Sequence, residues 1–369
     1  MDRRDFIKLT AITGTSATLA SCGSPENHII RFVPEDDVVP GIAQWKPSVC
    51  PLCSAGCGMT VRVIDNLVGG REQNLAQHKA NRDLSLEKRD IRTLEPGEAL
   101  FKGAAYVFHF AGIGDIVPSV ERPMEYMSVN VQGTVQVLEA ARASGSLRKL
   151  VYAASSSCYG LAETPTREDH PIRPQYPYAL SKYQGEQAVF HWHNVYKLPA
   201  NSIRIFNAYG IRSRTSGVYG AVFGVFLRQK LADKPFTVVG DGTQRRDFVY
   251  ASDLATAFLA AAESPIAGRV WNVGTGNPQT VNRLVELLGG PRVAIPKRPG
   301  EPDVTWADIS RIKADLGWRP SISFEDGVSR ILANIDYWRE APLWDPESIA
   351  KATKTWFETL SPGAEGRVP

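Results

Sequence analysis

Short apolar runs, each ending in small, polar or acidic residues, recur along the chain from residue 60 onward. Apolar runs of this length, bounded by such residues, predict buried strands. Strands are expected at 60–66, 84–91, 105–111, 149–155 and 201–207. Helices are expected at 129–143 and from Tyr178 onward, between successive strands. This alternation predicts an α/β fold with a doubly wound parallel sheet.

The tips of these strands carry residues suited to a dinucleotide. Asp65 ends one strand, and a carboxylate at that position accepts hydrogen bonds from the adenosine ribose. Its charge would repel the 2′-phosphate of NADP, so NAD is expected. Asp90 ends the next strand, where it would lie beside the adenine. Ala111 and Gly112 follow a third strand, and small residues there allow the backbone to approach a cofactor closely.

Tyr178 and Lys182 are four residues apart, so they lie on one face of the predicted helix. A nearby cation favours the phenolate, and it should draw the pKa of Tyr178 down towards neutral pH. Ser155, at the end of the 149–155 strand, could hold the substrate hydroxyl. Such a set moves a proton while a cofactor moves a hydride. The spacing alone is also common on solvated helix faces.

Ordered motifs along residues 60–340 carry a family resemblance. They are Val63-Ile-Asp65-Asn66, Asp90-Ile91, His109-Phe-Ala-Gly112, Asn130-Val-Gln-Gly-Thr134, Ser155-Ser-Ser-Cys-Tyr159-Gly160, Tyr178-x-x-x-Lys182, Arg204-Ile-Phe-Asn207-Ala-Tyr-Gly210, Gly240-Asp-Gly-Thr-Gln-Arg-Arg246-Asp247-Phe, Asn272-Val-Gly-Thr-Gly276 and Arg298-Pro-Gly-Glu301. The region resembles the extended short-chain dehydrogenase/reductases, specifically the nucleotide-sugar 4-epimerases. The resemblance implies a Rossmann-like sheet with a smaller C-terminal α/β substrate domain.

The same resemblance implies a role for each matching residue. Tyr178 would take the proton of the sugar 4-hydroxyl, Lys182 would hold the nicotinamide ribose, and Ser155 would bond the 4-oxygen. NAD would take the hydride and return it to the other face of a 4-keto sugar. The implied cofactor residues are Asp65, Asn66, Asp90, Ile91, Phe110, Ala111, Gly112, Asn130, Tyr178, Lys182 and Phe206. The implied nucleotide-sugar residues are Asn207, Arg246, Arg298 and Glu301, and arginine forks suit diphosphates.

Dehydratases and decarboxylases are the sister activities to weigh. Family dehydratases and some decarboxylases place acidic residues directly after the catalytic Ser or Thr, whereas this chain has Ser156 and Ser157 there. Epimerisation is therefore favoured. The neighbouring Cys158 is interpreted as a packed small hydrophobe and not as a nucleophile.

The first sixty residues have a different character. Arg3 and Arg4 precede a weakly apolar stretch, which predicts a twin-arginine export signal over residues 1–24. Residues 19–22 resemble a lipoprotein cleavage site, which would place a lipid and a membrane anchor on Cys22. A disordered basic N-terminus is the alternative. The signal points to the periplasm or membrane, whereas the epimerase-like region predicts a cytoplasmic enzyme.

Residues 25–59 are expected to form a linker that contains a cysteine motif. Cys50, Cys53 and Cys57 have the spacing of the N-terminal iron–sulfur motif of molybdopterin oxidoreductases. A four-iron cluster needs four thiolates, and the next cysteine after Cys57 is Cys158. A motif cut off from its context is favoured over a zinc site or an incomplete cluster. No metal is therefore expected unless a fourth ligand exists.

The resembled family begins with a strand, a Gly-rich turn and a helix ahead of the Asp65 strand. This sequence has no G-x-x-G-x-x-G turn. Because the first strand lies at the centre of such sheets, its loss would leave neighbouring strands unpaired, at roughly 1–3 kcal/mol per buried group. Residues 28–33 are the best candidate for a replacement strand. A natural fusion, a truncated pseudo-enzyme and an assembly artefact all fit this pattern.

The expected domains follow from these boundaries. An incomplete NAD-binding region spans 60–207 with later strands near 248–276, a substrate-binding region spans 208–345, and a C-terminal helix and tail span 346–369. The net charge of +3 is too small to indicate a nucleic-acid partner. A nucleotide-diphosphate sugar and a second copy of the chain are the expected partners. A working epimerase, a non-catalytic nucleotide-sugar binder and an iron–sulfur electron-transfer subunit remain as the three functional hypotheses.

Overall fold

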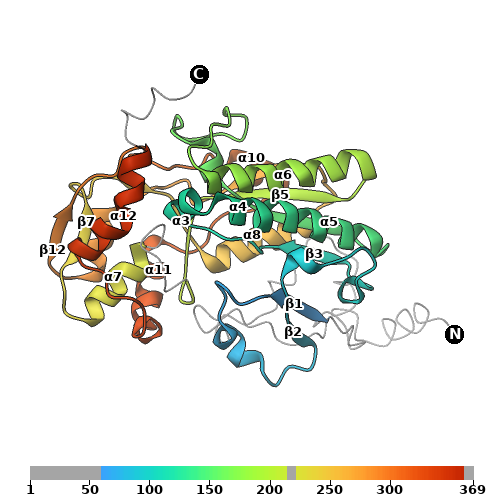
Figure 1. Cartoon of the computed structure of the whole chain (residues 1–369), viewed down its shortest axis with the longest axis horizontal. Helices are drawn as coiled ribbons and strands as arrows, with labels where there is room; N and C mark the ends of the chain where they lie inside the picture. Colours follow the sequence, from blue (N-terminus) through green and yellow to red (C-terminus); the bar gives the residue numbers. More distant parts are fainter. Residues whose placement is uncertain (1–59, 214–221, 361–369) are drawn as a thin grey trace, which may run out of the picture. The chain divides into compact units, whose positions relative to one another are not determined.

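The computed structural model describes residues 60–213 and 222–360 (Figure 1). These residues divide into two compact units. A small unit contains residues 60–64 and 71–88, and a large unit contains residues 65–70 and 89–360. The predicted export signal, the Cys22 lipid site, the cysteine motif and the replacement strand at 28–33 all lie outside the described residues.

The small unit is built on a two-stranded sheet. Strand β1 (Val61–Asp65) pairs with β2 (Leu84–Lys88), and the short helix η4 (Glu72–His78) lies between them in sequence. Both strands were predicted. The second ends earlier than expected because Asp90 caps a helical turn, η5 (Ile91–Thr93), by accepting the backbone N–H of Arg92.

A four-stranded parallel sheet forms the core of the large unit. Its order is β10 (Val270–Val273), β5 (Ala200–Ile205), β4 (Lys149–Ser155) and β3 (Tyr106–His109). The register pairs His109 with Tyr152 and Ser155 with Ile205, so the carboxyl ends of the strands share one edge. The predicted parallel sheet is thus confirmed, and its strands follow chain order from β3 to β10, as in one half of a doubly wound sheet. Among the described strands, β3 pairs with β4 alone.

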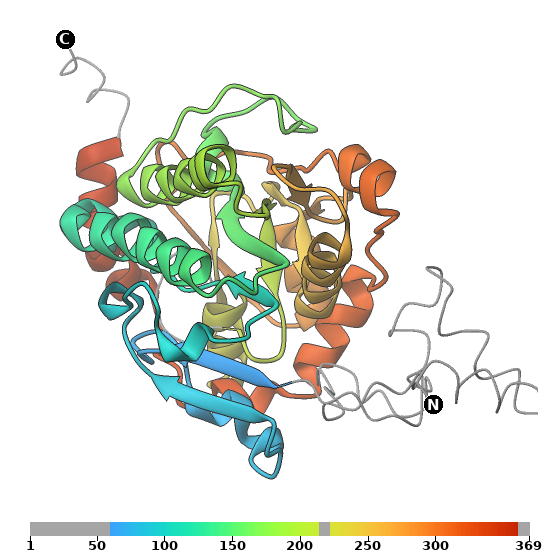
Figure 2. The same cartoon turned by 90° about the vertical axis from the view of Figure 1, so that its right-hand side faces the viewer.

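Helices cover both faces of this sheet (Figure 2). Helices α5 (Gly133–Ala143) and α6 (Pro177–Tyr196) pack on one face, and α8 (Ala251–Glu263) and α10 (Ser310–Leu316) pack on the other. The predicted helix at 129–143 is continuous with α4 (Pro123–Met127) through a π-helical turn, η7 (Ser128–Gln132). Such turns often mark functional sites, and this one carries Asn130.

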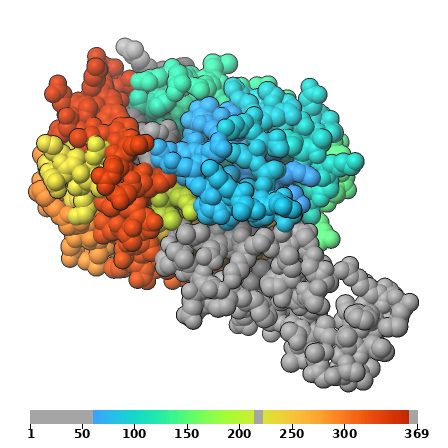
Figure 3. Space-filling model, turned by 90° about the horizontal axis from the view of Figure 1, so that it is seen from below, coloured from blue at the N-terminus to red at the C-terminus, as the bar shows by residue number. Residues whose placement is uncertain are grey.

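Smaller sheets and helices form the C-terminal part of the large unit. The paired strands are β7 (Phe236–Val239) with β12 (Arg292–Ile295), β6 (Asn207–Tyr209) with β9 (Phe248–Tyr250), and β8 (Arg245–Arg246) with β11 (Gln279–Thr280). The helices are α7 (Val222–Leu231), α9 (Val281–Leu288), α11 (Phe324–Leu332), η9 (Ile335–Trp338) and α12 (Pro346–Leu360). In Figure 3 the C-terminal residues in red lie beside α7 in yellow, where Arg228 donates to the carbonyl of Ala341.

Membrane spans and metal clusters are both absent from the described residues, which do not include the N-terminal segment. In residues 60–213 and 222–360, no helix is long and apolar enough to cross a membrane. The same residues contain no cluster of three His, Cys, Asp or Glu side chains that could hold a metal ion. Cys158 lies within them and is buried beside the sheet, as expected for a packed residue.

Candidate active site

Ser155 and Tyr178 come together at the carboxyl edge of the sheet. Ser155 is the last residue of β4 and caps the turn η8 (Ser156–Tyr159), while Pro177 fixes the start of α6 just before Tyr178. The hydroxyls of Ser155 and Ser157 are 2.7 Å apart. Burial raises the pKa of Tyr178, and a hydrogen bond with Ser155 opposes that shift. The structure therefore pairs the predicted base with the predicted substrate-holding hydroxyl.

Lys182 lies one turn further along α6, but it does not act on Tyr178 as expected. Its Nζ is 4.4 Å from the ring centroid of Tyr152, and the residue is 6% exposed. Burial lowers the pKa of Lys182 to about 7, opposed by the charge of Glu186. The pKa of Tyr178 is raised and not lowered, because burial disfavours its phenolate. The expected lowering of the Tyr178 pKa is therefore not found, and the catalytic and cofactor roles of Lys182 stay predictions.

A glycine and an asparagine complete the wall next to Lys182. Asn130 is buried, accepts the N–H of Ile113 at 2.8 Å and donates to Ser181 Oγ at 2.9 Å. A Cβ on Gly112 would lie 2.9 Å from Asn130 Oδ1 and 3.6 Å from Lys182 Nζ. No side chain larger than hydrogen fits there without a shift. The sequence-predicted residues Gly112, Asn130 and Lys182 thus lie against one another.

The surroundings of the Lys182 ammonium bear on its predicted contact with the nicotinamide ribose. Within residues 60–213 and 222–360, the structure records no hydrogen-bond acceptor or ion-pair partner for the Nζ of Lys182. A buried ammonium without an acceptor is costly, and the ribose hydroxyls expected at Lys182 would supply such acceptors. Phe110, before Ala111, is 52% exposed with its ring 4.4 Å from Phe258. Phe110 therefore packs on the α8 side of the sheet, opposite to the face that α6 and Lys182 cover.

The residues predicted for the adenosine end are joined by local hydrogen bonds. Asp65 accepts the N–H of Leu67 at 2.7 Å, and Asn66 donates to Asp90 at 3.2 Å. Hydrogen bonding from Arg92 lowers the pKa of Asp90 to about 2. Ile91 is buried, and a Cβ on Gly133 would lie 2.6 Å from its Cδ1. Asp90 and Ile91 therefore have structural roles in the turn, and their cofactor roles stay predictions.

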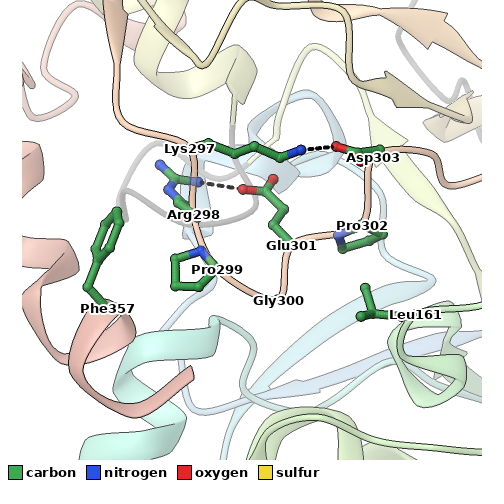
Figure 4. Close-up of a pocket in the computed structure, with 9 residues that line it drawn as sticks. All are labelled: Leu161, Lys297, Arg298, Pro299, Gly300, Glu301, Pro302, Asp303 and Phe357. Carbon is green, nitrogen blue, oxygen red and sulfur yellow. Dashed lines mark ion pairs between the residues drawn. The ribbon is translucent and has the colours of Figure 1, made fainter. Parts of the chain in front are cut away.

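Three of the four predicted nucleotide-sugar residues form a second cluster. Arg246 Nη2 is 2.7 Å from Glu301 Oε1, and Arg298 Nη1 is 3.8 Å from Glu301 Oε2. Arg298 and Glu301 line a cavity of about 550 Å³, in which Leu161 and Phe357 stand at opposite sides (Figure 4). Asn207 accepts a hydrogen bond from Thr305 at 2.7 Å and contributes no lining to this cavity. Phe206 is buried against Tyr159, with ring centroids 6.5 Å apart.

Sequence reasoning missed a buried ion pair behind the site. Glu186 lies on α6 at the same helical spacing as Tyr178 and Lys182, a signal that could have identified it. Its carboxylate is 2.6 Å from Arg204 Nη2, and Arg204 Nη1 donates to the hydroxyl of Tyr159 at 2.8 Å. This connects α6 to η8, which follows Ser155. Tyr126 was also missed, and its hydroxyl bonds the carbonyl of Gly114.

Comparisons with known proteins agree with this geometry. The model of the NAD dependent epimerase/dehydratase family matches residues 54–274. A UDP-glucose 4-epimerase of Mycolicibacterium smegmatis is 33% identical, over 72% of this chain and 88% of its own length. A UDP-glucuronate 4-epimerase of Thermodesulfobacterium geofontis is 31% identical, over 74% of this chain and 87% of its own length. The solved UDP-glucuronic acid 4-epimerase of Bacillus cereus, in complex with UDP-glucuronic acid and NAD, has a TM-score of 0.69 and 29% identity, over 76% and 91% of the two chains.

These matches define the class of the protein: it is an NAD-dependent enzyme of the extended short-chain dehydrogenase/reductase type with a Rossmann-like fold. The chain belongs to the NAD dependent epimerase/dehydratase family, and by family it is a nucleotide-sugar epimerase.

Proposed function

We propose that the chain is a nucleotide-sugar 4-epimerase that uses Tyr178 as its acid–base residue. The observation that carries the proposal is the hydrogen bond between Ser155 and Tyr178 at the carboxyl edge of the sheet, with Lys182 buried one turn further along α6. In this arrangement Ser155 Oγ holds the sugar 4-oxygen and the phenolate of Tyr178 takes its proton.

Bound NAD would supply the hydride chemistry: it would take the hydride from C4 and give it back to the opposite face after the 4-keto sugar has turned over. Lys182 would hold the nicotinamide ribose, and Asn130 keeps the Gly112–Ile113 backbone in place through its two hydrogen bonds to Ile113. Tyr178 then gives its proton back to the 4-oxygen. The chain's residues therefore move one proton out and back, with no net redox change.

The other end of the substrate is assigned to the arginine cluster. Arg246 and Arg298 would bind the diphosphate and nucleoside together with Glu301 and Asn207, because guanidinium forks match phosphate oxygens. Asp247, next to Arg246, is fully buried and accepts the backbone N–H groups of Thr275, Gly276 and Ala307. These bonds hold the strand end that presents Arg246.

Epimerisation is favoured over dehydration by the residues that follow Ser155. A dehydratase needs a second acid–base group to remove a proton from the neighbouring carbon. In this structure Ser156 and Ser157 occupy those positions, and the Ser157 hydroxyl is bonded to Ser155. Aspartate and glutamate are ionised at neutral pH and can act as bases, whereas a serine hydroxyl keeps its proton and cannot take over that role.

The test is a product assay with UDP-glucose and UDP-glucuronate, separating each substrate from its 4-epimer. An epimerase gives the 4-epimer with no solvent deuterium at C4 in heavy water, because the same hydride returns. A dehydratase gives a dehydrated keto sugar, which would contradict the proposal. The Y178F variant should lose about 10²–10⁴-fold in rate while it still binds UDP.

A non-catalytic nucleotide-sugar binder is the second candidate. The observation that favours it is the absence of a Gly-rich turn in the sequence, while the Arg246–Glu301–Arg298 cluster is complete. Measuring nicotinamide released from the denatured protein separates the two candidates. An NAD content near one per chain supports the epimerase, whereas UDP binding without NAD supports the binder.

The homodimer remains a proposal. Helices α5 and α6 pack together, and Val195 and Tyr196 at the end of α6 are exposed. A dimer through two helices is usual in the resembled family. Light scattering on the purified protein tests it, with a single-chain mass as the contrary result.

A further inference from the structure

The C-terminal helix α12 is attached to the loop that carries Arg298. Trp356 is 2% exposed, and its Nε1 donates to the carbonyl oxygen of Pro299 at 2.6 Å. The guanidinium carbon of Arg298 lies 5.6 Å from the centroid of the Trp356 ring. One side chain therefore contacts both the backbone and the charged group of this loop.

The same helix also packs against a second element, the helix α3 (Ile116–Glu121). There Val117 and Trp356 share a small apolar cluster with Ile295 and Ile349. Thr355 donates to Glu121 at 3.0 Å. Helix α3 directly follows the Gly112–Asp115 segment next to Tyr178. In Figure 1, α12 accordingly lies beside α3, so it bridges the arginine loop and the catalytic side.

We propose that Trp356 is a positioning residue that sets Arg298 for the diphosphate end of the substrate. The proposal rests on the binding role assigned to Arg298 above. A guanidinium binds anions through its N–H edge, so an aromatic face fixes its plane without competing for those donors. The bond to Pro299 fixes the backbone next to Arg298. Both contacts reduce the ordering that the loop must undergo when it binds an anion.

The test compares two tryptophan-to-phenylalanine variants by titration calorimetry with UDP. W356F keeps a ring beneath Arg298 and removes the bond to Pro299. W318F is the matched control, because Trp318 is also buried and donates through Nε1 to Thr256 at 2.9 Å, in a contact that does not include Arg298. W356F should raise the Kd for UDP roughly 3- to 10-fold, the value of one hydrogen bond, and W318F should leave it unchanged.

Two further measurements separate positioning from loss of folding. In an R298A background, W356F should have no further effect on the Kd, because its effect passes through Arg298. In the epimerase assay, W356F should raise KM and leave kcat unchanged. If W356F and W318F weaken UDP binding equally, or if W356F leaves the Kd for UDP unchanged, Trp356 does not position Arg298. Either result leaves the proposed function untouched. Failure of the unaltered protein to bind UDP overturns the proposed function itself.

Discussion

Replacing Glu186 by Gln is the sharpest test of the buried ion pair behind the catalytic residues. Glu186 and Arg204 are 1% and 5% exposed, and Glu186 accepts from Arg204 Nη2 at 2.6 Å and from Ser202 at 2.8 Å. The substitution preserves the shape of the side chain and removes its charge. Arg204 then stays buried as a cation without a counter-charge.

The expected cost follows from this burial. Removing one partner of a buried ion pair destabilises a protein by about 3–5 kcal/mol, because the remaining charge cannot be solvated. Gln still offers a carbonyl acceptor to Arg204, so we expect a loss near the lower end of that range. Arg204 also bonds Tyr159 in η8, so the loss should reach the segment after Ser155 and lower the turnover rate.

Urea unfolding at neutral pH measures the change, with E286Q as the matched control. Glu286 pairs with Arg283 on α9 at 2.8 Å, and both side chains are exposed. Exposed pairs contribute less than about 1 kcal/mol, so E286Q should unfold nearly as the unaltered protein does. A loss below 1 kcal/mol in E186Q, equal to that in E286Q, would refute the argument that burial makes this pair important.

Three further outcomes follow from the site. K182M should raise the unfolding free energy of the NAD-free protein below about pH 7. At that pH Lys182 is protonated in both the folded and the unfolded state, so folding bears the full cost of burying its charge. The gain should shrink as pH rises towards the model-peptide value of about 10.4, and a gain that grows with pH would contradict the reasoning. G112A should lower the amount of bound NAD, measured after denaturation, because the new Cβ would lie 2.9 Å from Asn130 Oδ1; an unchanged NAD content would show that the wall can relax. R246A should raise KM for the nucleotide sugar more than it lowers kcat, and an effect on kcat alone would place Arg246 at the reacting carbon.

Local patterns predicted the sheet because its strands are short, apolar and bounded by small residues. Strand β4 matches its predicted bounds, and all of its residues except Ser155 are buried, which leaves no competing amphipathic signal. The π-helical turn at Ser128–Gln132 could not be predicted, because it depends on the contacts of Asn130 with Ile113 and Ser181. Those partners are distant in sequence, and spacing rules describe only neighbours on one element.

Spacing along a helix also misjudged Lys182. It placed Lys182 one turn from Tyr178, which is correct, but the direction of a long side chain depends on what surrounds it. The ring of Tyr152, from the neighbouring strand, offers a face to the ammonium at 4.4 Å. The tuning prediction failed for this reason, while the pairing of Ser155 with Tyr178 did not depend on a flexible side chain.

The raised pKa of Tyr178 connects the acid–base chemistry of the site with the binding of its cofactor. Burial raises it, and the charge of Asp115 adds to the effect, so the chain's own groups keep the phenol protonated at neutral pH. A base in that state cannot take the proton of a sugar hydroxyl. A cation bound beside Tyr178, as the nicotinamide ring would be, would favour the phenolate and oppose this shift. Cofactor retention in a chain without the Gly-rich turn would then control both hydride transfer and the ionisation of Tyr178.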